Sequence, residues 1–310
     1  MLIEVDAEVY RRIFPSSPHP FISEPFIELN KGKAEKILRL VEDRKKPGMG
    51  LIAGVREKTL YSPFSAPFGG FHFRKSILYS SEIDGFLSFL KEYIITHGLD
   101  GIELTLPPDL YQSTINAKAV NSLIRMGFRN HIPDITSWIK LEEFQGSFSH
   151  RGSNESYRKA LRNGLSFRNT TDSNERKEVY DLIARNRARF GRPIFMTFDD
   201  VLNASELWRT DFFVVTAADH SILASGIFYR SFRDIIYALF WGDNEKGRNL
   251  NAMDFLSYKL WSFYKDLGYK YIDLGISTES GIPNNGLLRF KENHNAVSSI
   301  RHTFSWRTDH

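Results

Sequence analysis

The chain has 310 residues, with 41 lysines and arginines against 37 acidic residues, so its formal net charge is +4 at pH 7. Hydrophobic residues make up 42% and charged residues 25% of it, ordinary globular usage that excludes a disordered or low-complexity chain. The absence of cysteine excludes disulfide scaffolds, thiol enzymes and cysteine-ligated metal sites. At roughly 100–200 residues per domain, the length predicts two domains. No signal-peptide core and no stretch of ~18 apolar residues is found, so a cytoplasmic protein without a transmembrane segment is expected.

Positive charge is concentrated in residues 146–193. That segment holds eleven basic and five acidic residues, a net charge of +6, and the remainder of the chain carries −2. Nine of the eleven are arginines, whose planar guanidinium favours recognition of phosphate or carboxylate. The alternative is an arginine-rich solvated surface. DNA is not an expected partner, because the overall charge is mild and no helix-turn-helix or zinc-finger pattern occurs.

Helices and strands alternate in the first half of the chain. In chain order we predict a helix, a pair of strands, a helix, a strand, a helix and a strand, over residues 30–44, 51–55 with 59–64, 81–97, 101–106, 116–126 and 134–141. An irregular proline- and phenylalanine-rich segment precedes them.

The second half contains a similar series, with three consecutive strands that form an antiparallel meander. We predict a short basic helix with Ser153 as N-cap, and a longer helix whose Asp172 and Glu175 have the spacing of a capping box. The predicted elements are helices over 153–163, 172–189 and 251–267 and strands over 165–169, 211–217, 222–229, 234–241, 269–275 and 296–306.

An internal repeat links the two halves. Residues 98–104 (GLDGIEL) and 268–274 (GYKYIDL) match at glycine, isoleucine, acid and leucine, at an offset of 170 residues, and each follows a predicted helix. The repeat predicts two copies of one α/β (α+β) unit, each a mixed, mostly antiparallel sheet flanked by helices. We place the domains at 1–145 and 146–310.

The order of elements in the second half resembles the GNAT N-acyltransferase domain, and the tandem arrangement resembles the Fem-type peptidoglycan aminoacyltransferases. The segments that carry the resemblance are 62–70 (SPFSAPFGG), 157–162 (YRKALR), 273–275 (DLG) and 286–292 (GLLRFKE). It implies two GNAT-like units in tandem, the N-terminal one degenerate and the C-terminal one holding the donor site. The implied activity is acyl transfer to an amine of an anionic small-molecule or cell-envelope acceptor.

One segment departs from the family pattern. GNAT enzymes hold the pyrophosphate of coenzyme A with a glycine-rich loop that opens the helix after the meander. Residues 242–253 (GDNEKGRNLNAM) lack the second and third glycines, although the helix N-terminus is available. We assign donor binding to Arg248, Asn249, Asn251 and Ala252. Acyl-CoA, acetyl-CoA foremost, is the expected donor; the alternatives are an aminoacyl-tRNA donor, as in Fem-type enzymes, and a non-catalytic module that binds an anionic ligand.

Three residues near the repeated strand are the catalytic candidates. Lys291 matches a Phe-Lys pair that lies by the donor site in Fem-type relatives, and would neutralise a phosphate or steady the oxyanion; its alternative is a surface lysine paired with Glu292. Glu279 is a candidate general base or a solvated loop carboxylate. Asp273 is a candidate at the strand end or a structural carboxylate that accepts from loop N–H groups.

The substrate-binding candidates come from several elements. Arg158 and Arg162 share a helix face, as do Arg185 and Arg189, and two such pairs suit a diphosphate. The other candidates, each with a structural alternative as core, cap or turn residue, are Tyr237 and Trp241, which have the same strand parity, Asn285 and Ser65. No metal is expected, because the nine histidines show no metal-site spacing.

Overall fold

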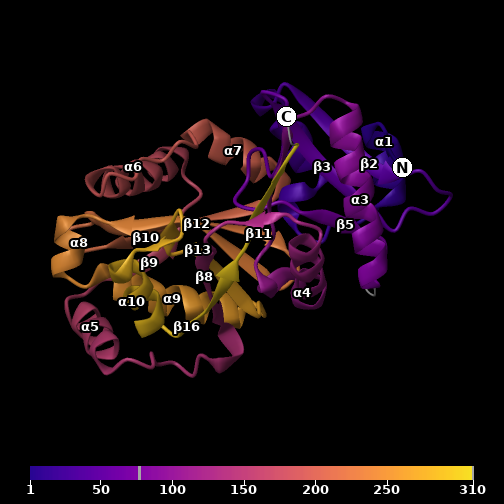
Figure 1. The fold of residues 1–310 in the computed structure, drawn as a ribbon. Coiled ribbons are helices and arrows are strands. Elements are labelled where there is room, and N and C mark those ends of the chain that lie inside the picture. The colour runs from indigo at the N-terminus through magenta and orange to yellow at the C-terminus, as the bar shows by residue number, and fades with distance from the viewer. Residues whose placement is uncertain (76–77, 309–310) are drawn as a thin grey trace. The chain divides into compact units, whose positions relative to one another are not determined.

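The computed structural model describes residues 1–75 and 78–308, which divide into two compact α/β units (Figure 1). Unit 1 comprises Met1–Ile135, Glu279–Ile282 and Ser299–His310, and unit 2 comprises Thr136–Thr278 and Pro283–Ser298. Each unit has its own mixed, mostly antiparallel sheet, which confirms the predicted fold class. The contact-based division falls ten residues before the boundary predicted at 145/146 and assigns the last strand to unit 1.

The sheet of unit 1 has the order β1-β2-β3-β4-β6-β17-β7, with β5 also paired to β3. Only β4 and β6 pair in parallel among the described strands of this sheet. The strands are β1 Leu2–Glu4, β2 Lys36–Glu42, β3 Met49–Arg56, β4 Thr59–Ser62, β5 Phe71–Phe73, β6 Gly101–Thr105, β7 Arg129–Asn130 and β17 Thr303–Arg307.

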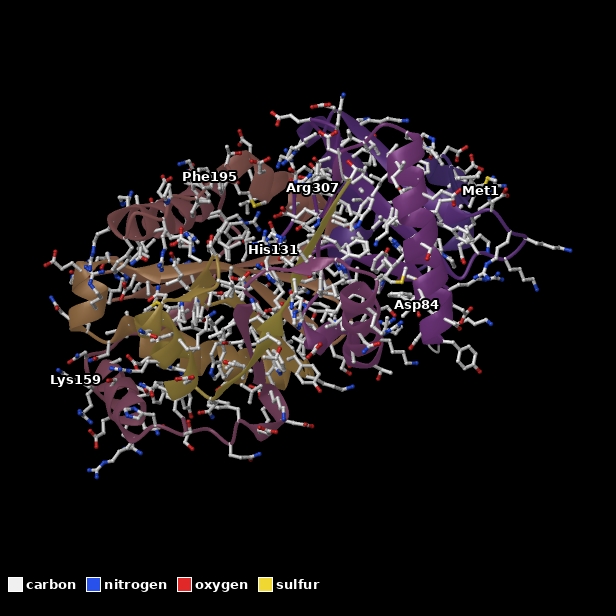
Figure 2. All side chains as sticks on the ribbon, viewed as in Figure 1. Met1, Asp84, His131, Lys159, Phe195 and Arg307 are labelled. Carbon is white, nitrogen blue, oxygen red and sulfur yellow. The ribbon has the colours of Figure 1, made fainter. Side chains whose placement is uncertain are left out.

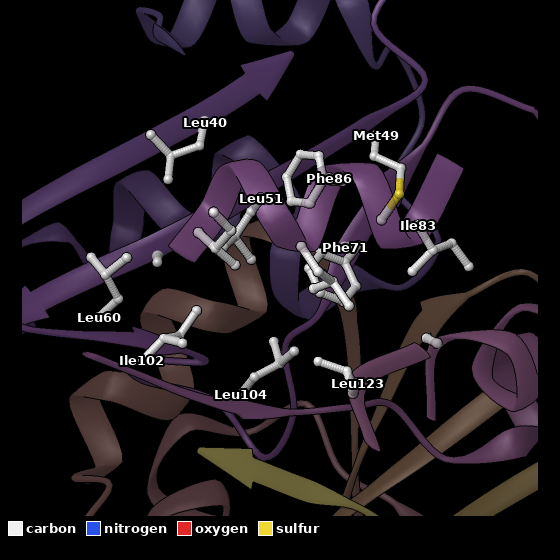
Figure 3. Close-up of a cluster of buried hydrophobic side chains, with 14 of the residues drawn as sticks. Leu40, Met49, Leu51, Leu60, Phe71, Ile83, Phe86, Ile102, Leu104 and Leu123 are labelled. Atoms are coloured by element: carbon white, nitrogen blue, oxygen red, sulfur yellow. The ribbon is translucent and has the colours of Figure 1, made fainter. Parts of the chain in front are cut away.

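Helix α3 (Ser80–Thr96) covers one face of this sheet. Its apolar residues repeat at helical spacing, so Ile83 and Phe86 lie in one buried cluster with Met49, Leu51 and Leu104 of the strands (Figure 3). Burial of such side chains stabilises the unit by about 1.5–3 kcal/mol each. The other helical segments of unit 1 are α1 Ala7–Ile13, α2 Glu24–Leu29, α4 Asp109–Arg125 and two 3₁₀ turns, Pro20–Ile22 and Lys31–Lys33.

The helix predicted over 30–44 is wrong, because this segment forms strand β2. Leu38 and Leu40 face the core under α3, whereas Ile37 and Val41 face a second cluster on the other side of the sheet. A strand buried on both faces loses its alternating pattern, and the remaining spacing imitates a helix. Arg39, between Leu38 and Leu40 in the chain, forms a two-point ion pair with Glu24, at 2.8 and 2.9 Å. A charged residue at this position conceals in the sequence that the strand is buried.

The sheet of unit 2 has the order β16-β8-β13-β12-β11-β10-β9. The predicted meander is confirmed in β10, β11 and β12, and β12 then pairs in parallel with β13. The strands are β8 Asp134–Lys140, β9 Ser166–Asn169, β10 Arg209–Thr216, β11 Ile222–Phe232, β12 Ile235–Asp243, β13 Tyr271–Ile276 and β16 Ala296–Arg301, with a separate pair, β14 Thr278–Glu279 and β15 Ile282–Pro283.

Helices cover both faces of this sheet (Figure 1). Helix α9 packs on one face with α5 beyond it, and α6 packs on the other face. His150 is the N-cap of helix α5, so the predicted cap Ser153 is wrong and lies buried inside the first turn. Helix α7 was not predicted, although Thr197 and Asp200 form a capping box at its start. The helices are α5 Arg151–Arg162, α6 Ser173–Arg189, α7 Phe198–Leu207, α8 Glu245–Asn249, α9 Ala252–Asp266 and α10 Asn285–Asn293, with a 3₁₀ turn at Leu141–Glu143.

The chain passes from one sheet to the other between β7 and β8 and again between β16 and β17. Strand β8 follows β7 in the chain but pairs with β13, and β17 follows β16 but pairs with β6. The single last strand predicted over 296–306 is therefore two strands in two sheets, interrupted at His302. The repeated segments correspond to β6 and β13, each of which follows a long helix and joins a parallel pair, as a duplication requires. No helix in the described part of the chain is both long and apolar enough to span a membrane.

Candidate functional site

In unit 2, strands β12 and β13 separate part-way along their length. Their parallel pairing ends at Tyr237 opposite Asp273, although β12 continues to Asp243 and β13 to Ile276. Backbone N–H and C=O groups beyond the last pair are released from each other, and they need other partners. We call this point the splay. A ligand carbonyl is a suitable acceptor for the released N–H groups.

Irregularities in both strands produce the splay. On β12, Leu239 is an extra residue, because consecutive residues of β11 lie opposite Ala238 and Phe240. On β13, the pairing with β8 shifts just after Asp273, where Gly275 has φ 66°. A left-handed conformation favours glycine, so this residue type allows the strand to bend there. The two bulges turn the strands apart at the same level of the sheet.

Lys291 reaches the bend from helix α10. Its side chain is 1% exposed, and Nζ donates to the carbonyl oxygens of Gly275 at 2.8 Å and Ile276 at 3.0 Å. The surface ion pair with Glu292 that the sequence left open is therefore wrong. An ammonium has three N–H donors, so one remains for another acceptor. Lys291 both fixes the bend of β13 and places positive charge at the splay.

Burial controls the charge of Lys291. It lowers the pKa of Lys291 from 10.5 to about 7, against the opposite effect of the Asp273 carboxylate. Both the ammonium and the amine are therefore populated near neutral pH. Asp273 itself is 1% exposed and accepts from the N–H of Gly275 at 2.8 Å, as the structural alternative predicted. Asp273 thus stabilises the bend of β13 through this hydrogen bond, and its negative charge favours the charged form of Lys291.

Helix α10 is fixed by a buried histidine. The Nδ1 of His294 lies 2.6 Å from the carbonyl oxygen of Phe290, and Nε2 lies 3.1 Å from Oδ1 of Asp254 at the start of α9. The indole N–H of Trp261 donates to the carbonyl of His294 at 3.0 Å. Phe290 also packs edge-on against Trp241, at 5.6 Å between ring centres. These contacts hold Lys291, one turn before His294, in register with the splay.

The segment expected to bind the donor phosphate forms the short helix α8. One amide of its first turn is already used, because Asn244 caps the helix and accepts from the N–H of Gly247 at 2.8 Å. A Cβ on Gly247 would lie 2.2 Å from the carbonyl oxygen of Leu223, so this glycine serves packing against β11. Asp254 adds an acidic group to the first turn of α9. A helix start that carries a carboxylate is a poor site for a second anion.

The four predicted donor-binding residues lie around α8 and the start of α9. Arg248 forms an ion pair with Asp243 at 3.3 Å, and Asn249 is exposed at the end of α8. Asn251 adopts a left-handed conformation before α9, and its Nδ2 is buried with no hydrogen-bond partner. Ala252 is fully buried as the first residue of α9. Their roles in binding a donor stay a prediction.

The predicted arginine pairs lie on opposite faces of the sheet. Arg158 and Arg162 are exposed on α5, on the side of α9, as is Lys159 between them, which Figure 2 labels. Arg185 and Arg189 are exposed on α6, which packs on the other face. The two pairs cannot hold one diphosphate together, because the sheet separates them. Arg158 and Arg162 alone stay a predicted substrate contact.

The equal parity of Tyr237 and Trp241 predicted that they share one face of the sheet, but they lie on opposite faces. Trp241 packs toward α9, 6.0 Å from the ring of Trp261. Tyr237 lies opposite Tyr229 on the α6 face. The extra residue Leu239 lies between them and reverses the alternation. Parity within a strand holds only where no bulge intervenes.

The remaining predicted residues are distributed over both units. Asn285 is the exposed first residue of α10, and its neighbour Asn284 is the cap of that helix. Glu279 is exposed on β14 and belongs to unit 1 by contacts. Ser65 of unit 1 donates to Oδ1 of Asn30 at 3.0 Å. Among the described residues, no group of three or more His, Asp or Glu side chains could hold a metal ion.

Solved structures resemble this arrangement over nearly the whole chain. FemX is 13% identical with a TM-score of 0.70, over 99% of this chain and 97% of that one. A tandem GNAT protein from the clavulanic acid biosynthesis pathway is 10% identical with a TM-score of 0.58, over 100% and 99%. The chain has a tandem GNAT fold. L-PGS from Bacillus licheniformis is also similar, 14% identical with a TM-score of 0.61, over 99% and 93%. No protein-family model and no curated protein matches the sequence.

Within the GNAT fold, the features that open the splay were not predicted from the sequence. The bulge at Leu239 carries no glycine or other turn signal, so nothing in its sequence marks it. Ser277 is 1% exposed and its hydroxyl has no hydrogen-bond partner, a second feature of this region that the sequence did not reveal. Gly275 carried a usable signal, because a glycine inside a strand pattern indicates a bulge.

Proposed function

We propose that unit 2 transfers an acyl group to an amine at the splay. Support comes from one observation above all: a buried lysine with a spare N–H stands where β12 and β13 part. The tandem GNAT fold supports a transferase of this kind.

The chemistry is addition and elimination at a carbonyl. The acceptor nitrogen attacks the acyl carbon, a C–N bond forms, and the bond from that carbon to the leaving oxygen or sulfur breaks. The amine loses one proton, which leaves with that oxygen or sulfur or passes to water. Negative charge develops on the carbonyl oxygen, and the ammonium of Lys291 together with freed backbone N–H groups near Leu239 would stabilise it. Such positioning needs no covalent intermediate on the chain.

An aminoacyl-tRNA is the donor that we favour. The helix α8 fills the place of a coenzyme A phosphate loop, and Asp254 puts negative charge at the start of α9. An ester donor, by contrast, requires only that its carbonyl reach the splay. A cytoplasmic location belongs to this proposal, since charged tRNA is a cytoplasmic molecule.

Acyl-CoA is the second candidate. It is favoured by Asn251, whose amide nitrogen is buried without a partner at the start of α9, and by the small Ala252 beside it. An acceptor with anionic groups, such as a cell-envelope precursor, fits the basic segment 146–193 in either case.

The experiment uses hydroxylamine as a generic amine acceptor for the full chain. Total charged tRNA and acetyl-CoA are offered as separate donors, and hydroxamate formation is measured by mass spectrometry. We expect chain-dependent product from charged tRNA, lost in Lys291→Met and retained in Arg289→Met, an exposed position on the same helix. Product formed from acetyl-CoA and not from charged tRNA would identify acyl-CoA, the second candidate, as the donor. Equal rates in the wild type and Lys291→Met would refute the site.

A further inference from the structure

Polar side chains gather on the α6 face of unit 2, beside the splay. Tyr229 of β11 and Tyr237 of β12 are directly opposite each other in the antiparallel register. Arg187 of α6 lies over Phe240, with 5.7 Å from its guanidinium carbon to the ring centre. Tyr237 is also the last residue of β12 that pairs with β13, opposite Asp273. The group thus stands one residue pair from the point where the strands part.

Two of these side chains carry buried donors without an acceptor. Tyr229 is 1% exposed, and its hydroxyl has no hydrogen-bond partner among the described residues. The Nε of Arg187 is likewise buried and unpaired. A buried polar group that makes no hydrogen bond costs about 1–3 kcal/mol. Two such donors, one on the sheet and one on the helix that covers it, indicate a ligand that completes them.

The charges around the group favour an anion. Burial and the nearby Arg192 lower the pKa of Arg187, and Tyr237 acts in the opposite direction. No carboxylate of the described chain forms an ion pair with Arg187. The carboxylate that acts on Tyr229, raising its pKa, is Asp200. Its Oδ2 is engaged in the cap of α7, where it accepts from the N–H and the hydroxyl of Thr197, each at 2.9 Å.

We propose that Arg187, Tyr229 and Tyr237 form a subsite for an oxyanion of the acceptor, a carboxylate or a phosphate. A guanidinium and two phenol hydroxyls donate to the anionic oxygens and leave the acceptor's amine free to reach the splay. This subsite rests on the proposed function for its link to acyl transfer. Its binding chemistry depends only on the three side chains.

The test measures binding of acetate, methyl phosphate and neutral acetamide to the full chain without any donor. Ligand-observed NMR gives dissociation constants, and the Nε–Hε resonance of Arg187 reports where the probe lies. We expect saturable binding of acetate or methyl phosphate, a shift of that resonance, and no effect of acetamide. Preference for acetate assigns a carboxylate acceptor, and preference for methyl phosphate assigns a phosphate.

Variants give the sharper comparison. Tyr229→Phe removes one hydroxyl and keeps the ring that packs against Trp208 at 5.4 Å. We expect it, and Arg187→Gln, to weaken anion binding at least tenfold, while Arg185→Gln, at an exposed position of the same helix, leaves binding unchanged. Equal binding of acetamide, or full anion affinity in both variants, would overturn the subsite.

The two proposals fail in different ways. Normal transfer to hydroxylamine together with no anion binding rejects the subsite and leaves the proposed function intact. Anion binding that depends on Arg187, in a chain with no transfer from either donor, rejects the function and leaves a binding site.

Discussion

The two units are built around the same parallel pair of strands, and they differ at its end. In unit 1, β4 and β6 stay paired through Ser62 opposite Leu104, the last residue of β4. In unit 2, the equivalent pairing stops at Tyr237 opposite Asp273, while both strands continue. No register shift interrupts the pairing of β3 with β4, whereas β12 carries its bulge at Leu239. The parallel pair therefore stays together to the end of β4 in unit 1, whereas in unit 2 its two strands separate before they end.

Unit 1 fills the corresponding place with its own chain. The segment after β4 returns, and the N–H of Gly69 donates to the carbonyl of Thr105 at 2.9 Å. The N–H of Gly70 donates to the hydroxyl of Ser62 at 3.1 Å. A Cβ on Gly69 would lie 2.6 Å from the backbone of Ser62 and Pro63, so only glycine permits this approach. That the first half is degenerate stays a prediction, and this filled strand end supports it.

The side chain that supports the strand end also differs. In unit 1, Asn116 of α4 donates to the carbonyl of Pro107 at 2.7 Å, just beyond β6. In unit 2, Lys291 of α10 donates to the carbonyls at the bend of β13. Both an amide and an ammonium donate to a carbonyl, but only the ammonium brings charge. The two strand ends therefore differ by an opening and by a charge, and the proposed function rests on that difference.

The largest expected effect comes from removing that charge. Lys291→Met should lower kcat/KM in the hydroxylamine assay by about 10²–10³-fold, the usual cost of one oxyanion donor. Asn116→Ala is its counterpart in unit 1 and should leave kcat/KM unchanged. A similar loss in both variants would mean that the units do not differ in this way.

The pH dependence should follow Lys291. Its pKa of about 7 means that the ammonium is lost as pH rises, so kcat should fall about tenfold per pH unit above that value. Hydroxylamine is uncharged above pH 7, so ionisation of the acceptor does not contribute to the pH dependence of kcat in this range. Lys291→Arg keeps its charge and should abolish the alkaline decline. A decline that persists in Lys291→Arg belongs to another group.

A smaller effect is expected at the bend of β13. A Cβ on Gly275 meets nothing within 4 Å, so Gly275→Ala acts through its φ of 66° alone. The left-handed conformation costs about 1–2 kcal/mol for a residue with a Cβ, and we expect kcat/KM to fall about tenfold. The readout is the same assay, with circular dichroism to confirm an intact fold. Unchanged activity would show that the bend is dispensable.

The smallest effect on catalysis is expected from the matched glycine of unit 1. Gly69→Ala forces its Cβ against backbone and should lower the free energy of unfolding by about 1–3 kcal/mol. The kcat of the folded protein should not change. Urea unfolding and the transfer assay at low temperature separate the two quantities, and a fall in kcat would place unit 1 in the site.

The sequence predicted the parts of this molecule that depend on local pattern. The meander, helices α3, α6 and α9 and the repeated strand follow from alternation, helical spacing and terminal glycines, and Phe290-Lys291 followed from a resemblance. Strand β2 failed because burial on both faces erased its alternation. The opposite faces of Tyr237 and Trp241 depend on a bulge at Leu239 with no residue signature. The unpaired hydroxyl of Tyr229 is a property of packing and is invisible in the chain alone.

Hydrogen–deuterium exchange with the bound donor tests the central claim most directly. The donor is the one that supports hydroxamate formation, and exchange is compared with and without it, peptide by peptide. The account predicts protection in residues 235–243 and 271–277, on the two sides of the splay, and none in residues 59–70 or 101–107. Protection of the unit 1 segments, with the splay unaffected, would contradict it.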